Sequence, residues 1–178
     1  MSFPEIGYGN FQKKLLGPFT CFSLKFSSAI IAVDDSLIDS ENHYFSSKSV
    51  KQGYINHCPN IKTPAKVIYN GYSDEFWTNT NGNQKSSDII TVAAGIESNR
   101  RYVLKGIDLL IDLARRKPEI RITLVGGQLP PNIKTPNNVS IIGSCNAETL
   151  RELYSKHKFY AQLSISEGFP NAICEAML

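Results

Sequence analysis

The sequence has few residues that could build a metal centre or a disulfide framework. It contains four cysteines and three histidines in 178 residues, and no Cys-x-x-Cys pair. The cysteines lie far apart, at Cys21, Cys58, Cys145 and Cys174. This spacing supports neither a zinc site nor a disulfide framework. We therefore expect no bound metal, and reduced, buried thiols in a cytoplasmic protein.

Long apolar runs are also missing. No stretch approaches the roughly 18 apolar residues that a membrane-spanning helix requires. The apolar segment 15–24 follows Lys13-Lys14, as in a signal peptide, but Pro18 interrupts it and Lys25 follows it directly. These two residues argue against a signal peptide, so we expect neither a signal peptide nor a membrane span.

Common phosphate-binding and catalytic motifs are absent as well. There is no G-x-G-x-x-G and no G-x-x-x-x-G-K-[ST], which argues against dinucleotide-binding and P-loop proteins. No Ser/His/Asp or Cys/His arrangement has a recognisable spacing. The formal net charge of +3 is spread along the chain. Such a distribution does not require nucleic acid, and a binder of diphosphates or of an anionic membrane surface would fit equally well.

The sequence does contain a regular alternation of predicted strands and helices. Short apolar runs, typical of buried strands, occur at 28–33, 65–69, 89–94, 121–125, 138–143 and 159–165. Amphipathic helices are predicted over 105–116 and from Asn146 to about His157, and a third from Asn171. This order predicts an α/β fold, with a Rossmann-like, mostly parallel sheet covered by helices on both faces.

Local signals predict several boundaries. Gly17-Pro18 is expected to break or kink a helix over 11–27, and Asp34 to cap a helix that runs to about Tyr44. Asn70-Gly71 is a strong turn signal. In the helix over 105–116, the buried face is predicted to consist of Ile107, Leu110, Ile111 and Ala114, with Asp112 and Arg116 paired in solvent.

Ligands of such sheets bind outside the carboxyl ends of the strands. Three parts of the sequence fall there: the loop before Lys105, the pair Gly126-Gly127, and the segment from Glu167 onward. Arg100 lies five residues before Lys105, and the two charges together could neutralise a diphosphate. Arg101 competes for the same role, and spacing alone does not separate the two arginines.

Two glutamates, Glu167 and Glu175, flank the Gly-Phe-Pro-Asn turn near the end of the sequence. Pro170 suits the first turn of a helix, which places Glu167 in the preceding loop and Glu175 about one turn into the helix. A helix start offers free N–H groups to anions, and carboxylates accept hydrogen bonds from hydroxyls. A nucleotide sugar carries both groups. Taken alone, however, such glutamates are more often ordinary surface carboxylates.

Together, five segments resemble a known family. They are Val67-Ile-Tyr-Asn-Gly-Tyr-Ser-Asp-Glu-Phe76, Lys105-Gly-Ile-Asp108, Leu124-Val-Gly126, Val139-Ser-Ile-Ile-Gly143 and Ser166-Glu-Gly-Phe-Pro-Asn-Ala-Ile-Cys-Glu175. In order and spacing they resemble group 1 (family 4) retaining glycosyltransferases of the GT-B fold, over roughly residues 28–178. The two glutamates with seven residues between them are the most specific part of this resemblance.

The resemblance implies roles for individual residues. Arg100 and Lys105 correspond to the pair that binds the donor diphosphate, Glu167 to the carboxylate that contacts the donor sugar, and Glu175 to the residue that holds the ribose hydroxyls. The implied substrate-binding set is completed by Gly126, Gly168, Phe169, Pro170 and Asn171. The catalytic set would be Glu167, Lys105 and Arg100, without metal or cofactor. The donor would be a UDP- or GDP-linked sugar. Where the family usually has Gly-Arg directly after the strand, this chain has Gly95-Ile-Glu-Ser-Asn99.

The resemblance also implies a domain organisation. Residues 1–69 correspond to the last part of an N-terminal acceptor domain and the hinge, and 70–178 to an incomplete nucleotide-sugar-binding domain. We expect a partial chain that alone does not transfer a sugar, with a nucleotide sugar and a sugar or lipid-linked acceptor as partners. Polysaccharide biosynthesis and peripheral membrane association fit this family. A non-catalytic nucleotide-sugar-binding module and a sugar epimerase of the same fold remain the alternatives.

Overall fold

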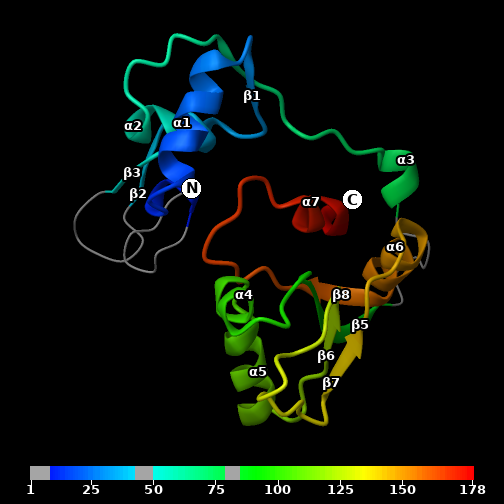
Figure 1. The fold of residues 1–178 in the computed structure, drawn as a ribbon. Coiled ribbons are helices and arrows are strands. Elements are labelled where there is room, and N and C mark those ends of the chain that lie inside the picture. Colours follow the sequence, from blue (N-terminus) through cyan, green and yellow to red (C-terminus); the bar gives the residue numbers. More distant parts are fainter. Residues whose placement is uncertain (1–8, 43–49, 79–84) are drawn as a thin grey trace. The chain divides into compact units, whose positions relative to one another are not determined.

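The computed structural model describes residues 9–42, 50–78 and 85–178. The chain divides into two compact units. The first contains Met1–Gly71 together with Glu167–Phe169, and the second contains Tyr72–Ser166 and Pro170–Leu178. Figure 1 shows the helices and strands of both units.

The second unit is built on a four-stranded parallel sheet. Its strands are β5 (Ser86–Val92), β6 (Ile122–Val125), β7 (Val139–Ile142) and β8 (His157–Tyr160). They are ordered β7-β6-β5-β8, and every neighbouring pair is parallel. Parallel neighbours need crossover connections. Helices lie between β5 and β6 and between β7 and β8, whereas an irregular segment connects β6 to β7. The predicted α/β class with a parallel Rossmann-like sheet is confirmed.

Helices cover both faces of this sheet. They are α3 (Asp74–Trp77), α4 (Asn99–Leu104), α5 (Ile107–Arg116), α6 (Ala147–Lys156) and α7 (Asn171–Met177). One hydrophobic cluster joins α4 and α5 to β6 and β7. A second cluster joins Ile90 and Val125 to Tyr154 of α6, Trp77 of α3 and Ala176 of α7. The residue pairs Ile89/Ile90 and Leu124/Val125 each contribute one side chain to each cluster, as alternation along a strand requires.

The helix α5 follows its predicted pattern. Its buried residues are Ile107, Leu110, Ile111 and Ala114. On the exposed side, Arg116 Nε lies 2.8 Å from Asp112 Oδ2. The next helix begins as predicted too, because the Asn146 side chain accepts a hydrogen bond from the Thr149 N–H at 2.9 Å. The spacing of apolar residues was sufficient here because each feature lies within a single helix.

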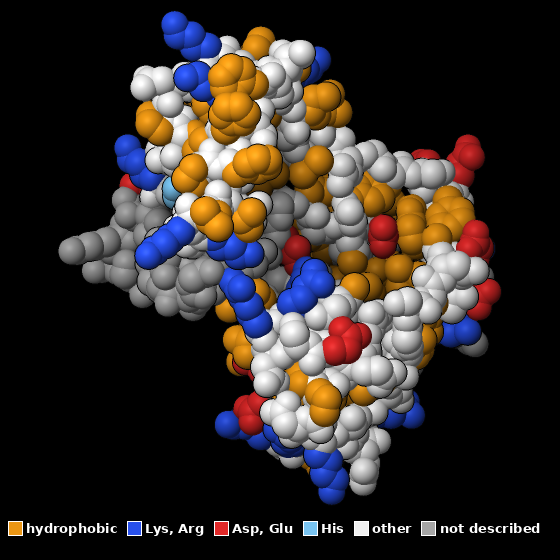
Figure 2. All heavy atoms as spheres, viewed as in Figure 1, with side chains coloured by type: hydrophobic (Ala, Val, Ile, Leu, Met, Phe, Trp, Pro, Cys, Tyr) orange, Lys and Arg blue, Asp and Glu red, His pale blue; other side chains and the backbone are white. Residues whose placement is uncertain are grey.

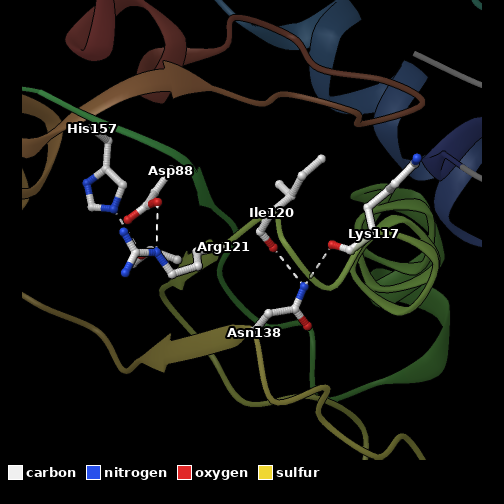
Figure 3. A network of polar contacts seen from close by, with 7 residues as sticks. Asp88, Lys117, Ile120, Arg121, Asn138 and His157 are labelled. Atoms are coloured by element: carbon white, nitrogen blue, oxygen red, sulfur yellow. Dashed lines mark hydrogen bonds and ion pairs between the residues drawn. The ribbon is translucent and has the colours of Figure 1, made fainter.

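Polar contacts fix the edge of the sheet where its strands begin (Figure 3). Arg121, just before β6, pairs with Asp88 of β5 at 3.0 Å. The amide group of Asn138 faces the carbonyls of Lys117 and Ile120 at 3.2 and 2.7 Å, which holds the end of α5 against β7. The strands end at the opposite edge. The connections to α4, α6 and α7 begin there.

Two boundaries in the second unit differ from the prediction. The segment 95–104, expected to be a loop, contains α4, because Ser98 caps a short helix by accepting the Arg101 N–H at 3.3 Å. The last strand was expected over 159–165 and is His157–Tyr160. His157 starts this strand rather than continuing α6, since its ring nitrogens contact Leu153 O and Thr123 Oγ1 at 2.7 and 2.9 Å.

In its described residues, 9–42, 50–71 and 167–169, the first unit contains two small sheets and two α-helices. The pair β1 (Ile30–Ala32) and β4 (Ala65–Val67) is parallel, and β2 (Ser40–Asn42) and β3 (Val50–Gln52) are antiparallel. The α-helices are α1 (Leu16–Phe26) and α2 (Tyr54–His57), and short 3-10 turns span Asn10–Gln12 and Asp35–Leu37.

Two predictions for the first unit are wrong. Asp34 caps a short 3-10 turn, whose chain then enters β2, so no helix continues from it through residue 42. The rest of that predicted helix, residues 43 and 44, lies outside the described residues. Gly17-Pro18 does not break a helix but lies in the first turn of α1. Proline is tolerated there because its missing N–H has no intrahelical partner.

The outer face of α1 is apolar and exposed. Leu15, Phe19, Phe22 and Phe26 are between 60% and 86% exposed. They follow the i, i+4, i+7, i+11 spacing of one helical face. Figure 2 shows hydrophobic side chains gathered on this part of the surface. Within the described ranges, no helix is both long and apolar enough to cross a membrane.

A disulfide holds the inner face of α1. Cys21 of α1 is bonded to Cys58, which directly follows α2, with their Cα atoms 5.3 Å apart. The expectation of four reduced thiols is therefore wrong for this pair. The spacing of 37 residues gave no sign of it, because only the packing of α1 against the segment after α2 brings the two sulfurs together. Cys145 and Cys174 are free.

The disulfide between Cys21 and Cys58 predicts how many cysteines react with a thiol reagent. It also predicts that the protein loses stability when the disulfide is removed. Unfolded without reductant, the protein should show two reactive thiols, and after reduction four. Replacing Cys21 and Cys58 together by serine should lower the free energy of unfolding by about 2–4 kcal/mol, because the unfolded chain without the disulfide has a higher conformational entropy. Urea unfolding measures this, with Cys145→Ser as the control. Four reactive thiols in the unreduced, unfolded chain would contradict the bridge.

Candidate functional site

The turn that carries Lys105 connects α4 to α5 in the second unit. Lys105 ends α4, and its N–H donates to Arg101 O at 2.9 Å. Gly106 then adopts φ 67°, ψ 19° and begins α5. This left-handed conformation reverses the chain, and glycine takes it without steric cost. The turn thus fixes the backbone that presents the half-buried Lys105 side chain.

A second segment packs directly on this turn. The Ile165 N–H donates to Leu104 O at 2.9 Å. A Cβ atom at Gly106 would collide with the carbonyl group of Leu163, so these two backbones are in close contact. The segment after β8, which leads toward the two glutamates, is thereby fixed beside the Lys105 turn.

Gly126 and Gly127 follow β6, at a place where the loop after β6 packs closely against the loop after β5. Gly126 has φ 110°, and a Cβ there would lie 3.1 Å from Ala93 O. A Cβ on Gly127 would lie 3.0 Å from Glu97 Oε1. That carboxylate also accepts the Gln128 N–H at 3.3 Å. Gly126, predicted to contact substrate, therefore lies where the loops after β5 and β6 meet.

The two candidate arginines differ in their surroundings. Both belong to α4, and neither lies in a loop as expected from the sequence. The guanidinium of Arg101 occupies the space over Gly95 that a Cβ would fill. Arg101 thus folds back over the loop that follows β5, although both arginines are exposed on α4. Neither conformation was visible from the spacing to Lys105.

Glu175 lies on α7, as predicted, and is half-buried against α6. The Tyr154 hydroxyl donates to Glu175 Oε2 at 3.5 Å, a long hydrogen bond. Burial raises the pKa of Glu175, and the bond from Tyr154 opposes that rise. At the start of α7, the side-chain oxygen of Asn171 accepts a hydrogen bond from the Tyr72 hydroxyl at 2.6 Å. The helix begins at Asn171, as predicted, and Pro170 directly precedes it.

The remaining predicted residues belong to the other unit. Glu167, Gly168 and Phe169 are part of the first unit. There, the ring of Phe169 lies 6.2 Å from that of Tyr69. The second unit itself brings Lys105, Gly126 and α7 to one edge of the sheet, because they follow the carboxyl ends of the adjacent strands β5, β6 and β8.

Two comparisons with known proteins bear on this arrangement. The family model "Glycosyl transferases group 1" matches residues 96–178, somewhat less than half of the chain. This part of the chain is similar to the group 1 glycosyltransferases. The matched range contains every predicted site residue, from Arg100 to Glu175. The family resemblance expected from the sequence is therefore confirmed, and glycosyl transfer is the general activity of the family.

A solved structure is similar over most of the chain. Sucrose-phosphate synthase from Thermosynechococcus elongatus matches with a TM-score of 0.65 and 16% identity, over 93% of this chain and 42% of that one. At this identity the match supports the GT-B fold alone. The chain thus spans less than half the length of that glycosyltransferase. No curated protein sequence matches the chain.

Sequence reasoning missed three polar residues of this region. Glu97 accepts the N–H of Gln128, which follows the glycine pair, Tyr72 contacts Asn171, and Tyr154 contacts Glu175. Each of these contacts joins residues 21 or more positions apart, so no local pattern could reveal them. Among the residues that the structure describes, no group of three or more His, Cys, Asp or Glu is placed to hold a metal ion.

Proposed function

We propose that the second unit binds a nucleoside-diphosphate sugar and serves as the donor site of a retaining glycosyltransferase. The observation that carries this proposal is the group 1 family match, which covers all predicted donor-site residues. The geometry supports it, because the Lys105 turn and the segment leading to Glu167 are joined by the bond between Ile165 and Leu104. Ligands of parallel α/β sheets bind at this edge.

In this proposal each group meets a matching part of the donor. Lys105, with one arginine, neutralises the diphosphate and stabilises it as it leaves the sugar. Glu175 accepts hydrogen bonds from the ribose hydroxyls. For Glu167, which belongs to the first unit, the family resemblance implies contact with the hydroxyls of the transferred sugar. For the segment from Gly168 to Asn171 it implies contact with the sugar and phosphates. The protein supplies positive charge and acceptor oxygens, which a diphosphate and a diol require respectively.

The finer properties of the whole protein belong to the same proposal. We infer a hexosyltransferase that uses a UDP- or GDP-linked donor and a sugar or lipid-linked acceptor, which would bind outside the second unit. A role in polysaccharide biosynthesis would follow from such an acceptor. A cytoplasmic location stays a prediction. The Cys21–Cys58 bridge argues against it, because disulfides are typical of oxidising compartments.

Calorimetric titration with UDP, GDP, ADP and their glucose or mannose conjugates tests the proposal. We expect one nucleotide to bind and Lys105→Ala to weaken that binding about tenfold to a hundredfold, since a hydrogen bond to a charged group is worth about 1.5–3 kcal/mol. The control is Lys156→Ala, which removes an exposed lysine paired with Glu152 on α6. Absence of binding by every compound would reject a donor site in this chain.

The same titration separates the two arginines. Arg101→Ala removes the guanidinium that lies over Gly95, and Arg100→Ala removes the neighbouring arginine of α4. The arginine that supplies the second charge is the one whose loss weakens binding of the diphosphate more than binding of the monophosphate. Comparing UDP with UMP, or GDP with GMP, thus assigns the residue without knowledge of the sugar.

A further inference from the structure

Tyr154 occupies a rigid position beside the predicted donor site. It is 7% exposed and lies on α6. Its ring is 6.0 Å from that of Trp77 and 5.9 Å from that of Tyr160, so neighbours restrain it from α3 and from β8. Aromatic pairs at these distances pack favourably. The direction of its hydroxyl group is therefore set by the core of the unit.

That hydroxyl group is directed at Glu175. A buried tyrosine hydroxyl usually finds a hydrogen-bond partner, and here it is Oε2 of Glu175, at 3.5 Å. The contact joins α6 to α7. Glutamate on an otherwise unrestrained helix face would sample several rotamers, and this bond favours those that keep Oε2 next to α6. The other carboxylate oxygen, Oε1, is left to accept hydrogen bonds from a ligand.

We propose that Tyr154 is a positioning residue of the donor site, which acts by holding the carboxylate of Glu175 ready for the ribose hydroxyls. The proposal rests on the proposed function, because it requires that Glu175 binds the nucleotide. Tyr154 itself touches no substrate. Holding Glu175 in place before the ligand arrives reduces the entropy lost on binding, a cost that corresponds to about threefold to tenfold in affinity for one long side chain.

The contact also affects the charge of Glu175. Burial raises the pKa of Glu175, and the hydrogen bond from Tyr154 lowers it. The titratable groups facing Tyr154 are Glu175 on α7, Tyr160 on β8 and Cys145 before α6. Without the Tyr154 hydroxyl, the Glu175 carboxyl would keep its proton to a higher pH. Since only the ionised carboxylate accepts two hydroxyl protons, nucleotide binding would then be lost at a higher pH as the solution is acidified.

The test compares Tyr154→Phe with Tyr160→Phe by calorimetric titration with UDP and with GDP between pH 4.5 and 8. Tyr160 is a suitable control because its hydroxyl donates to Gln162 at 2.6 Å while its ring contacts the same cluster. We expect Tyr154→Phe to bind about threefold to tenfold more weakly at pH 7.5, and to lose binding at a higher pH than wild type. Tyr160→Phe should follow the wild-type profile.

A double-mutant cycle separates positioning from a structural role. If Tyr154 acts through Glu175, then Tyr154→Phe should change the affinity of the Glu175→Gln variant by less than twofold. An additive effect in that background, or an unchanged pH profile of Tyr154→Phe, would overturn the proposal. Should Tyr154→Phe unfold, the pKa of Glu175 measured by carboxyl NMR in Tyr154→Leu, which also has no side-chain donor, decides instead, and an unchanged value overturns it. Wild type that binds neither nucleotide rejects the proposed function itself.

Discussion

Replacing Glu175 by glutamine is expected to weaken nucleotide binding by about tenfold to a hundredfold, since a hydrogen bond to a charged group contributes about 1.5–3 kcal/mol. Glutamine keeps the size of the side chain, and its amide still fits beside the Tyr154 hydroxyl. It loses the negative charge and one of the two acceptor oxygens that a ribose diol requires. Calorimetric titration with the nucleotide that wild type binds gives the change in Kd.

The matched control for this substitution is Glu152→Gln. Glu152 lies on the neighbouring helix α6, is exposed, and is paired with Lys156 at 3.9 Å. The same chemical change there should leave the Kd within twofold of wild type. Equal affinities for Glu175→Gln and wild type would show that Glu175 does not contact the nucleotide, and would remove the main carboxylate of the second unit from the proposed site.

The Glu175→Gln variant should also be at least as stable as wild type at neutral pH. Burial raises the pKa of Glu175 above its value in the unfolded chain. The folded state therefore favours the protonated carboxyl, and the ionised form destabilises the fold once the pH exceeds the unfolded pKa. Glutamine has no charge to bury. The melting temperature of the variant should equal or exceed that of wild type at pH 7, and the difference should vanish near pH 4.

Replacing Gly106 by alanine is expected to destabilise the protein by about 3–5 kcal/mol. Two costs combine: a left-handed conformation for a residue with a Cβ atom, and a collision that forces the backbone to move. Gly106 has φ 67°, and the added Cβ would collide with the carbonyl of Leu163. Urea unfolding measures the loss, which is large for a domain whose total stability is about 5–15 kcal/mol.

The control for Gly106→Ala is Gly143→Ala in the same unit. A Cβ on Gly143 meets nothing within 4 Å, and its φ is not positive. The substitution there should change stability by less than about 1 kcal/mol. If both variants unfold at the same urea concentration, the close approach of the Lys105 turn to the segment after β8 is wrong. The geometry of the predicted site would then lose its main structural support.

The sheet, its order of helices and the buried face of α5 could be predicted because their signals are local. Ile107, Leu110, Ile111 and Ala114 recur at helical spacing within a single segment, and short apolar runs indicate buried strands wherever they occur. The cap at Asn146 is equally local. The family resemblance was also visible, since it depends on motifs that keep their order and spacing along the chain.

Other features depend on tertiary contacts and were missed or misjudged. The boundary between α6 and β8 follows from the contacts of His157 with Leu153 and Thr123, which pull that residue into the sheet. The bridge between Cys21 and Cys58 depends on how α1 packs. No property of the isolated segments distinguishes these outcomes from the expected ones.

The candidate site was predictable in composition but not in its supporting contacts. The sequence placed Lys105, Gly126 and Glu175 after successive strands, and the strand order makes β6, β5 and β8 neighbours. The contact between Tyr154 and Glu175 needs the packing of α7 on α6, which lies beyond the reach of periodicity. The short helix α4 was overlooked because six residues are too few to show an amphipathic pattern.

The most direct test of the central claim is to map nucleotide binding on the isotope-labelled protein by amide NMR. If the second unit is a donor site, titration with UDP or GDP should shift the amide signals of Lys105, Gly106 and Asn171 in a saturable manner, with one dissociation constant. The signals of Asp88 and Arg121, at the opposite edge where the strands begin, should stay in place. Saturable shifts confined to the first unit, or none with either nucleotide, would contradict a donor site formed by these residues.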